Sequence, residues 1–100
     1  MATIWKYPVT GETTVHEVPK GAAPLHMGAD PEGNLCVWFV VNPDLPKEKR
    51  AIIVVGTGHS VPDDAAKAYV GTFVSGRFVN HVFAPPADHV AMPVFAATVN

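Results

Sequence analysis

Hydrophobic residues are grouped along the chain into short runs, and the intervals between the runs hold glycine, proline, asparagine and aspartate. The runs are rich in β-branched and aromatic residues, a pattern that is typical of a compact all-β fold. The residues predicted as strands are 4–7, 13–18, 24–29, 34–41, 50–55, 69–74 and 77–83. We therefore expect a small sandwich or barrel of about five to seven short, mostly antiparallel strands, with at most one short helical turn.

Turn-forming residues indicate which strands are neighbours. Residues 30–33, Asp-Pro-Glu-Gly, have proline second and glycine last, which suits a β-turn between strands 24–29 and 34–41. Ser75-Gly76 predicts a tight hairpin between strands 69–74 and 77–83. Its alternating faces are Val79, His81 and Phe83 on one side, and Phe78, Asn80 and Val82 on the other. Strands 4–7 and 13–18 flank Thr10-Gly11-Glu12 and are candidates for another hairpin.

Two of the predicted strands, 34–41 and 50–55, are apolar on both faces. The first of them is expected to be central in its sheet and covered on both sides, which places Trp38 in the core. Residues 62–68 are predicted to form a short helical turn, with Pro62 at its first position and Asp63 and Asp64 in its first turn. Ser60 or Asp63 is the expected cap of this turn.

The most informative segment is the change from the apolar residues 52–55 to Gly56-Thr57-Gly58-His59. Loops that follow a buried strand are where small proteins hold binding groups. Glycines let backbone N–H groups point at one place, and such concavities bind anions. The alternative is a strand-exit turn that needs positive φ at one glycine. The lysine and the glycine spacing of the known phosphate-binding motifs are both missing.

Composition narrows the classes of function. Hydrophobic residues make up 48% of the 100-residue chain and charged residues only 16%, against about 25% charged in average domains. We therefore expect a single domain in a homo-oligomer, in which another subunit covers part of the apolar surface. The net charge is −2, and the basic residues are dispersed apart from one short cluster, Lys47-Glu48-Lys49-Arg50, which a glutamate interrupts. This distribution argues against binding of duplex nucleic acid.

The cysteine content and the lengths of the apolar runs indicate the cellular compartment. Cys36 is the one cysteine and lies between Leu35 and Val37, so we expect a buried, inert thiol and a reducing compartment. The N-terminus lacks the pattern of a signal peptide, and no apolar run has the length of a membrane span. Secretion and membrane association are therefore not expected.

Aromatic and cationic residues supply further candidate binding groups. Trp5 and Tyr7 share one face of the first strand and are candidates for stacking on a base. Lys6 and Arg77 are expected to be exposed cations that can pair with phosphate.

Histidines are numerous but scattered. They are His16, His26, His59, His81 and His89. Because no two have the close spacing of metal ligands, we predict no metal and no other cofactor. Two of them, at positions 59 and 81, are candidates for an acid–base pair, but the position of His81 on one face with Val79 and Phe83 favours a half-buried histidine with its own hydrogen-bond partners.

Five segments together resemble a family of short proteins found mainly in tailed bacteriophages and prophages. The segments are IWKYP at 4–8, VPKGA at 18–22, GTGHSVP at 56–62, YVGTF at 69–73 and NHVF at 80–83. The resemblance covers residues 3–84, and the tail after Ala84 extends the usual pattern. It implies a phage accessory protein that acts in the cytoplasm of the bacterial host, and it implies no particular activity.

The first functional hypothesis is a non-catalytic protein that binds and sequesters a small anion, a nucleotide or a cyclic nucleotide-type signal of bacterial immunity. The expected ligand-binding residues are His59, Thr57, Gly58, Trp5, Arg77 and Tyr69. The alternative is a protein–protein interaction module, either an inhibitor of a host factor or a minor virion component. The third hypothesis is a small phosphoesterase. Residues 1–84 are expected to form the β domain, and 85–100 an extension that packs on its own sheet or on a neighbouring subunit.

Overall fold

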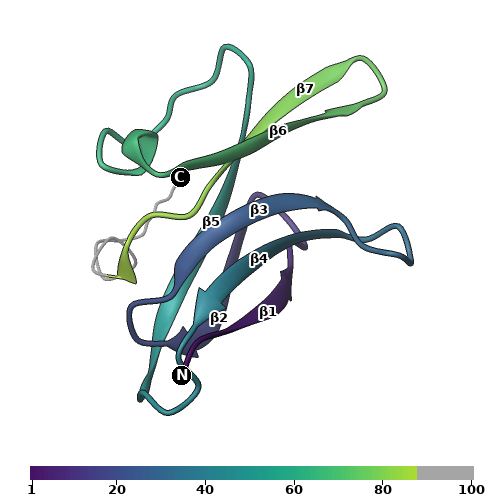
Figure 1. The fold of residues 1–100 in the computed structure, drawn as a ribbon. Helices are drawn as coiled ribbons and strands as arrows, with labels where there is room; N and C mark the ends of the chain where they lie inside the picture. The colour runs from purple at the N-terminus through teal and green to yellow at the C-terminus, as the bar shows by residue number, and fades with distance from the viewer. Residues whose placement is uncertain (88–100) are drawn as a thin grey trace.

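The computed structural model describes residues 1–87, which form seven strands in two antiparallel sheets that face each other (Figure 1). The elements are β1 (Thr3–Pro8), β2 (Thr13–Pro19), β3 (Ala23–Ala29), β4 (Leu35–Val41), β5 (Lys47–Gly56), the 3-10 turn η1 (Ala65–Lys67), β6 (Tyr69–Ser75) and β7 (Phe78–Phe83). One sheet has the order β1-β4-β3 and the other β2-β5-β7-β6. The predicted all-β architecture with one short helical turn is confirmed.

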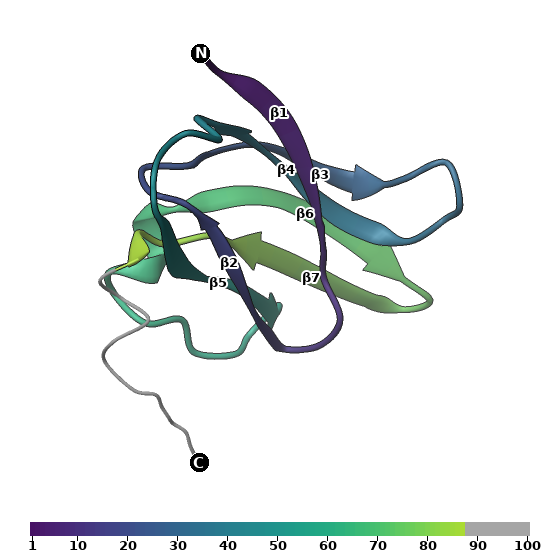
Figure 2. The same cartoon turned by 90° about the horizontal axis from the view of Figure 1, so that it is seen from below.

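The two hairpins with strong turn signals are present, and their turns lie at the same end of the molecule (Figure 2). β3 pairs with β4, and β6 pairs with β7. Ser75 lies opposite Phe78, so the connecting loop is Gly76-Arg77, one residue later than predicted, and Gly76 has a φ of +61°. Positive φ is the conformation that a two-residue hairpin loop demands.

The candidate hairpin of the first two strands is wrong. β1 pairs with β4 and β2 pairs with β5, so the segment between them crosses from one sheet to the other. An isolated two-stranded hairpin buries too little apolar surface to be stable, whereas pairing with the apolar β4 and β5 adds each strand to a growing sheet. The crossing is held by Thr14, whose Oγ1 accepts the Thr10 N–H at 2.9 Å.

The core lies between the facing surfaces of the sheets. Phe39 and Val37 from one sheet and Ile52 and Val82 from the other are fully buried. The edge strands β3 and β6 of the two sheets approach each other closely. A Cβ on Gly71 of β6 would lie only 2.8 Å from Sδ of Met27 on β3. Glycine at this position therefore sets how closely the sheets pack.

β4 is central in its sheet, as predicted, but it is not covered on both sides. Val37 and Phe39 face the core, whereas Trp38 lies on the outer face, where it is half-buried and stacks on His26 with ring centroids 6.5 Å apart. The core position predicted for Trp38 is therefore wrong. Only the inner face of the β1-β4-β3 sheet packs against the other sheet, so its outer face lacks a covering layer within residues 1–87.

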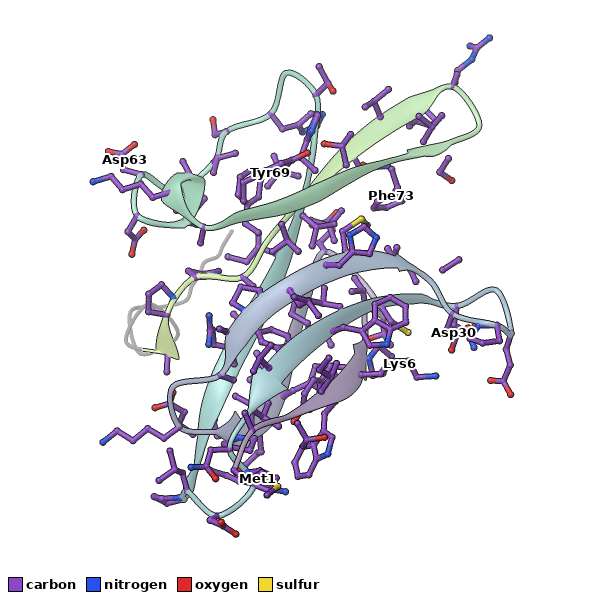
Figure 3. The ribbon with its side chains drawn as sticks, viewed as in Figure 1. Met1, Lys6, Asp30, Asp63, Tyr69 and Phe73 are labelled. Carbon is purple, nitrogen blue, oxygen red and sulfur yellow. The ribbon has the colours of Figure 1, made fainter. Side chains whose placement is uncertain are left out.

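The turn between β3 and β4 is built around Asp30 and confirms the prediction from the sequence. The buried carboxylate accepts the backbone N–H of Glu32 and of Asn34, and it forms an ion pair with Lys6 at 2.8 Å (Figure 3). The Lys6 ammonium, together with these N–H groups, holds the pKa of Asp30 below its ordinary value. Nearby, Cys36 is buried as expected, and burial raises the pKa of its thiol.

Arg50 is buried in the interior, although the sequence places it in a short basic cluster. Its guanidinium donates to three backbone carbonyls, those of Ala22 at 2.6 Å, Ala84 at 2.9 Å and Pro85. Its Cζ lies 5.3 Å from the centre of the Phe39 ring. Burial lowers the pKa of the guanidinium from its ordinary value. Arg50 thereby ties the chain after β7 and the turn before β3 to β5.

The predicted helical turn is shorter than residues 62–68 and has a different cap. It is the 3-10 turn η1, and Asp64 caps it by accepting the N–H of Ala65 at 3.0 Å. Pro62, Asp63 and Ser60 lie before the cap, so the assignments of the first helical position and of the cap are wrong. The predicted extension begins in the described part with Pro85, which is buried, but residues 88–100 lie outside the described residues.

Candidate functional site

β5 ends in a tight turn, which the sequence analysis had given as the alternative to an anion-binding loop. His59 N–H donates to the Gly56 carbonyl at 3.1 Å, and Gly58 has a φ of +91°, which glycine adopts without strain. Thr57 N–H is also bound, to the Val79 carbonyl at 3.0 Å. Two of the amides that an anion-binding loop would offer are therefore used inside the fold. The groups that this turn can still offer to a ligand are therefore mainly side chains.

An open hollow of about 830 Å³ lies beside this turn. It is lined by residues 12–13, 53–57, 59–60, 62, 75 and 77–80, which come from the start of β2, the end of β5, the loop after it and the tip of the β6–β7 hairpin. Small-molecule sites have volumes of about 300–1,000 Å³. Three of the predicted ligand-binding residues, Thr57, His59 and Arg77, line this hollow.

The hollow combines one cation with polar and aromatic groups. Arg77 and Phe78 come from the hairpin tip, and 67% of the Phe78 surface is exposed. Asn80 adds an amide group, whereas Glu12 brings a carboxylate to the rim. An exposed aromatic ring and a guanidinium that line the same hollow suit a ligand that has both a flat ring and a negative charge. The carboxylate opposes that charge.

A chain of hydrogen bonds runs across the outer face of the second sheet and ends at the hollow. The Tyr69 hydroxyl lies 2.6 Å from Thr72 Oγ1, which lies 2.9 Å from His81 Nδ1. His81 Nε2 lies 2.8 Å from Thr57 Oγ1. The chain forms because Thr72 and His81 are directly opposite on β6 and β7. It joins Tyr69 to Thr57, two residues that the sequence analysis had grouped together.

The Thr57 hydroxyl has two neighbours. Its oxygen lies 3.2 Å from the Val79 carbonyl, to which it can donate, and 2.8 Å from His81 Nε2. The Val79 carbonyl also accepts the Thr57 N–H at 3.0 Å, so the direction of the bond between Thr57 and His81 depends on the tautomer of the imidazole. In either direction, the contact with His81 fixes the position of the Thr57 side chain.

His59 and His81 lie on opposite faces of the sheet. A Cβ on Gly56 would lie 3.5 Å from His59 Cδ2 and 3.6 Å from Asn80 Oδ1, so the His59 ring is on the Asn80 side. Side chains alternate along a strand, and His81 therefore points to the other side. The β5–β7 pair separates the two rings, and the structure does not bring them together as an acid–base pair.

The remaining candidates lie away from the hollow. Trp5 is in the other sheet, where it packs against the core, and the Lys47 ammonium lies 5.9 Å from the centre of its ring. Tyr7 contacts Phe39 edge-on, with centroids 5.5 Å apart. Lys6 is paired with Asp30 and is not a free cation. Strand pairing with β4 turns both aromatic residues inward, so neither of them offers a stacking surface at this site.

Two residues of the hollow, Phe78 and Asn80, were not among the predicted ligand-binding residues. The hairpin pattern had placed them on one face, and their register in the structure agrees: Asn80 pairs with Gly56 and Phe73, and Phe78 with Ser75. The signal was the exposed aromatic residue next to Arg77 at a hairpin tip. Whether this aromatic residue lines a hollow depends on the path of the loop after β5, and the sequence did not determine that path.

Searches for other kinds of site were limited to the described part of the chain. Within residues 1–87, no group of three or more histidine, cysteine, aspartate or glutamate residues is arranged to hold a metal ion, and His89 lies outside this range. Over the same residues, no helix is both long and apolar enough to span a bilayer.

Comparison with known proteins places the chain in a family. A search of curated proteins and a search of solved structures each found no match. The profile of a family described as "Domain of unknown function (DUF7352)" matches residues 1–92, a range that contains β1 to β7 and the hollow. The chain therefore belongs to the DUF7352 family.

Proposed function

We propose that this protein binds a small anionic ligand of the nucleotide class in the hollow beside the β5 turn and does not convert it. The observation that carries the proposal is the meeting of Arg77, Phe78, Asn80 and Thr57 in one open hollow of about 830 Å³. A cation, a free aromatic face and neutral hydrogen-bonding groups are the parts from which a nucleotide site is built.

Each part has a role in this proposal. The Arg77 guanidinium pairs with a phosphate oxygen, and the Phe78 ring stacks on the base. Stacking one base on an aromatic side chain contributes about 1–3 kcal/mol. The side-chain amide of Asn80 offers donors and an acceptor, so it can form hydrogen bonds with the edge of the base. Thr57 lines the hollow, and its contact with His81 keeps its side chain in one fixed orientation.

The absence of turnover is part of the proposal. His59 and His81 are on opposite faces, which opposes an acid–base pair. Sequestration of a cyclic nucleotide-type immune signal in the bacterial cytoplasm is the biological role that the resemblance to phage proteins suggests for such binding.

Isothermal titration calorimetry of the protein with mononucleotides, dinucleotides and cyclic dinucleotides tests the proposal. We expect one of these classes to bind, and Arg77→Met and Phe78→Ala each to weaken binding by at least about tenfold. Lys49→Met is the matched control, since Lys49 is an exposed cation on β5 outside the hollow. Analysis of the nucleotide after the titration tests turnover.

Three results would contradict the proposal. Binding that Arg77→Met and Lys49→Met weaken equally would show a general charge effect rather than a site. Binding of no nucleotide, together with retention of inorganic phosphate alone, would remove the base from the proposal. Hydrolysis that is lost in His81→Gln but kept in His59→Gln would favour the phosphoesterase hypothesis instead.

A further inference from the structure

One sheet edge of this protein is chemically unlike the others. Within residues 1–87 the edge strands are β1 and β3 in one sheet, and β2 and β6 in the other. Proteins protect such edges with charged side chains, prolines or bulges, because unpaired backbone groups attract other strands. β1 carries Lys6 and Pro8, β2 carries Glu17 and Pro19, and β3 carries Pro24 beside a bulge. β6 contains neither a charged residue nor a proline.

The exposed backbone groups of β6 follow from the hairpin. Ser75 and Phe78 flank a two-residue loop, so they form the hydrogen-bonded pair that closes it. In an antiparallel pair, bonded and non-bonded positions alternate. The N–H and C=O groups of Val74 and Thr72 therefore point away from β7. Among the backbone bonds of residues 1–87, none from another strand reaches this edge.

Exposed apolar side chains gather around the same edge. Val74 is 68% exposed and lies opposite Val79, which is 38% exposed, on the outer face of the hairpin. Tyr69, at the other end of β6, is 57% exposed. The only interruption in the pairing of β6 is a register shift between Tyr69 and Gly71, next to the Met27 contact. From Thr72 to the hairpin turn, β6 is a regular strand, and it runs away from β3 toward that turn (Figure 1).

We propose that a second copy of this chain pairs with β6, antiparallel and β6 to β6, so that the two β2-β5-β7-β6 sheets join into one continuous sheet. A second copy fits because the N–H and C=O groups of every second residue of β6 point outward. In an antiparallel arrangement, the outward N–H groups of one copy meet the outward C=O groups of the other copy. The strand is uncharged, so two copies meet without like-charge repulsion. A two-fold contact of this kind uses the same surface on both subunits.

This inference does not rest on the proposed ligand. The hydrogen-bond chain from Tyr69 to Thr57 lies on the outer face of the joined sheet, so the contact brings two such chains onto one surface. Arg77 belongs to the hairpin turn and Phe78 to β7, so neither residue lies on the edge of β6 that contacts the second copy. Each copy therefore keeps its own hollow.

Light scattering coupled to size-exclusion chromatography, over a series of concentrations, tests the contact. We expect the full chain to run as a dimer, and Val74→Lys to raise its dissociation constant by about tenfold or more, because each copy then brings a charge into the uncharged contact. Val15→Lys is the matched control: Val15 is 49% exposed on the edge strand β2. It should remain dimeric.

Hydrogen exchange on the unmodified protein gives an answer even if a variant fails to fold. In the proposed dimer the amides of Thr72 and Val74 are protected, and their protection increases with protein concentration. A monomer at every concentration would overturn the proposal. So would a dimer that Val15→Lys dissociates and Val74→Lys does not, or rapid exchange at both amides in a dimer, because each of these would place the contact elsewhere.

Discussion

The buried Arg50 offers the sharpest test of how this fold is held together. Its side chain satisfies the carbonyls of Ala22, Ala84 and Pro85, which belong to the turn before β3 and to the chain after β7. The perturbation is Arg50→Met, which keeps an unbranched chain over Phe39 and removes every donor. The variant therefore separates the hydrogen bonds of the guanidinium from the packing of its apolar stem.

The magnitude follows from two opposing effects. Each buried carbonyl left without a donor costs about 1–3 kcal/mol, so three of them cost about 3–6 kcal/mol when part of the loss is recovered by water or by small shifts. The variant no longer buries a guanidinium, and this relief offsets part of the loss. We expect a net loss of about 2–4 kcal/mol from a domain whose whole stability is about 5–10 kcal/mol.

Urea denaturation followed by fluorescence measures this loss, provided that the m-value stays unchanged. Arg77→Met is the control, since Arg77 is exposed at a hairpin turn, and we expect it to lie within about 0.5 kcal/mol of the unmodified protein. Arg50→Lys should recover only part of the stability, because one ammonium cannot reach three carbonyls in the geometry of the guanidinium. An Arg50→Met variant as stable as the control would refute the reasoning and show that desolvation of the charge cancels its hydrogen bonds.

Two further predictions concern packing and pH. Gly71→Ala is expected to cost about 1–3 kcal/mol in the same assay because its Cβ would overlap Met27; the loss should shrink in a Met27→Ala background, and equal losses in both backgrounds would show that the two residues are not coupled. Asp30 has a lowered pKa in the folded protein, so its stabilising contribution is fully present above about pH 4 and is lost as the pH falls through the lowered pKa. Asp30→Asn should therefore be less stable than the unmodified protein at neutral pH and should lose less on acidification from about pH 5 to pH 2. An unchanged acid dependence of stability in Asp30→Asn would assign that dependence to other carboxylates.

Much of the fold could be predicted from the sequence because the signals were local. The Asp30–Gly33 and Gly76-Arg77 turns are set by residues that adopt positive φ or pre-form a turn, and both hairpins are present. The error in the first two strands was an error of long-range pairing. A turn of type Thr-Gly-Glu permits a hairpin, but the larger burial gained by adding each strand to β4 or β5 decides otherwise.

The candidate site could be predicted only in part. Thr57, His59 and Arg77 were identified as binding groups and line one hollow, whereas Trp5 is turned into the core of the other layer. His81 was considered as an acid or base, yet its partners, Thr57 and Thr72, come from two different strands or loops. The separation of His59 from His81 depends on the face to which the turn after β5 folds back, and no residue pattern encodes that direction.

The sequence by itself determined the strands, the tight turns, the glycine with positive φ after β5 and the burial of Cys36, because each depends on the residues next to it in the chain. Only the tertiary structure decided that Arg50 is an interior clamp, that Lys6 is used by Asp30, and that β6 is an edge strand of the sheets formed by residues 1–87. These properties depend on which strand lies beside which, and pairing is settled by the area buried across the whole sandwich rather than by any local preference.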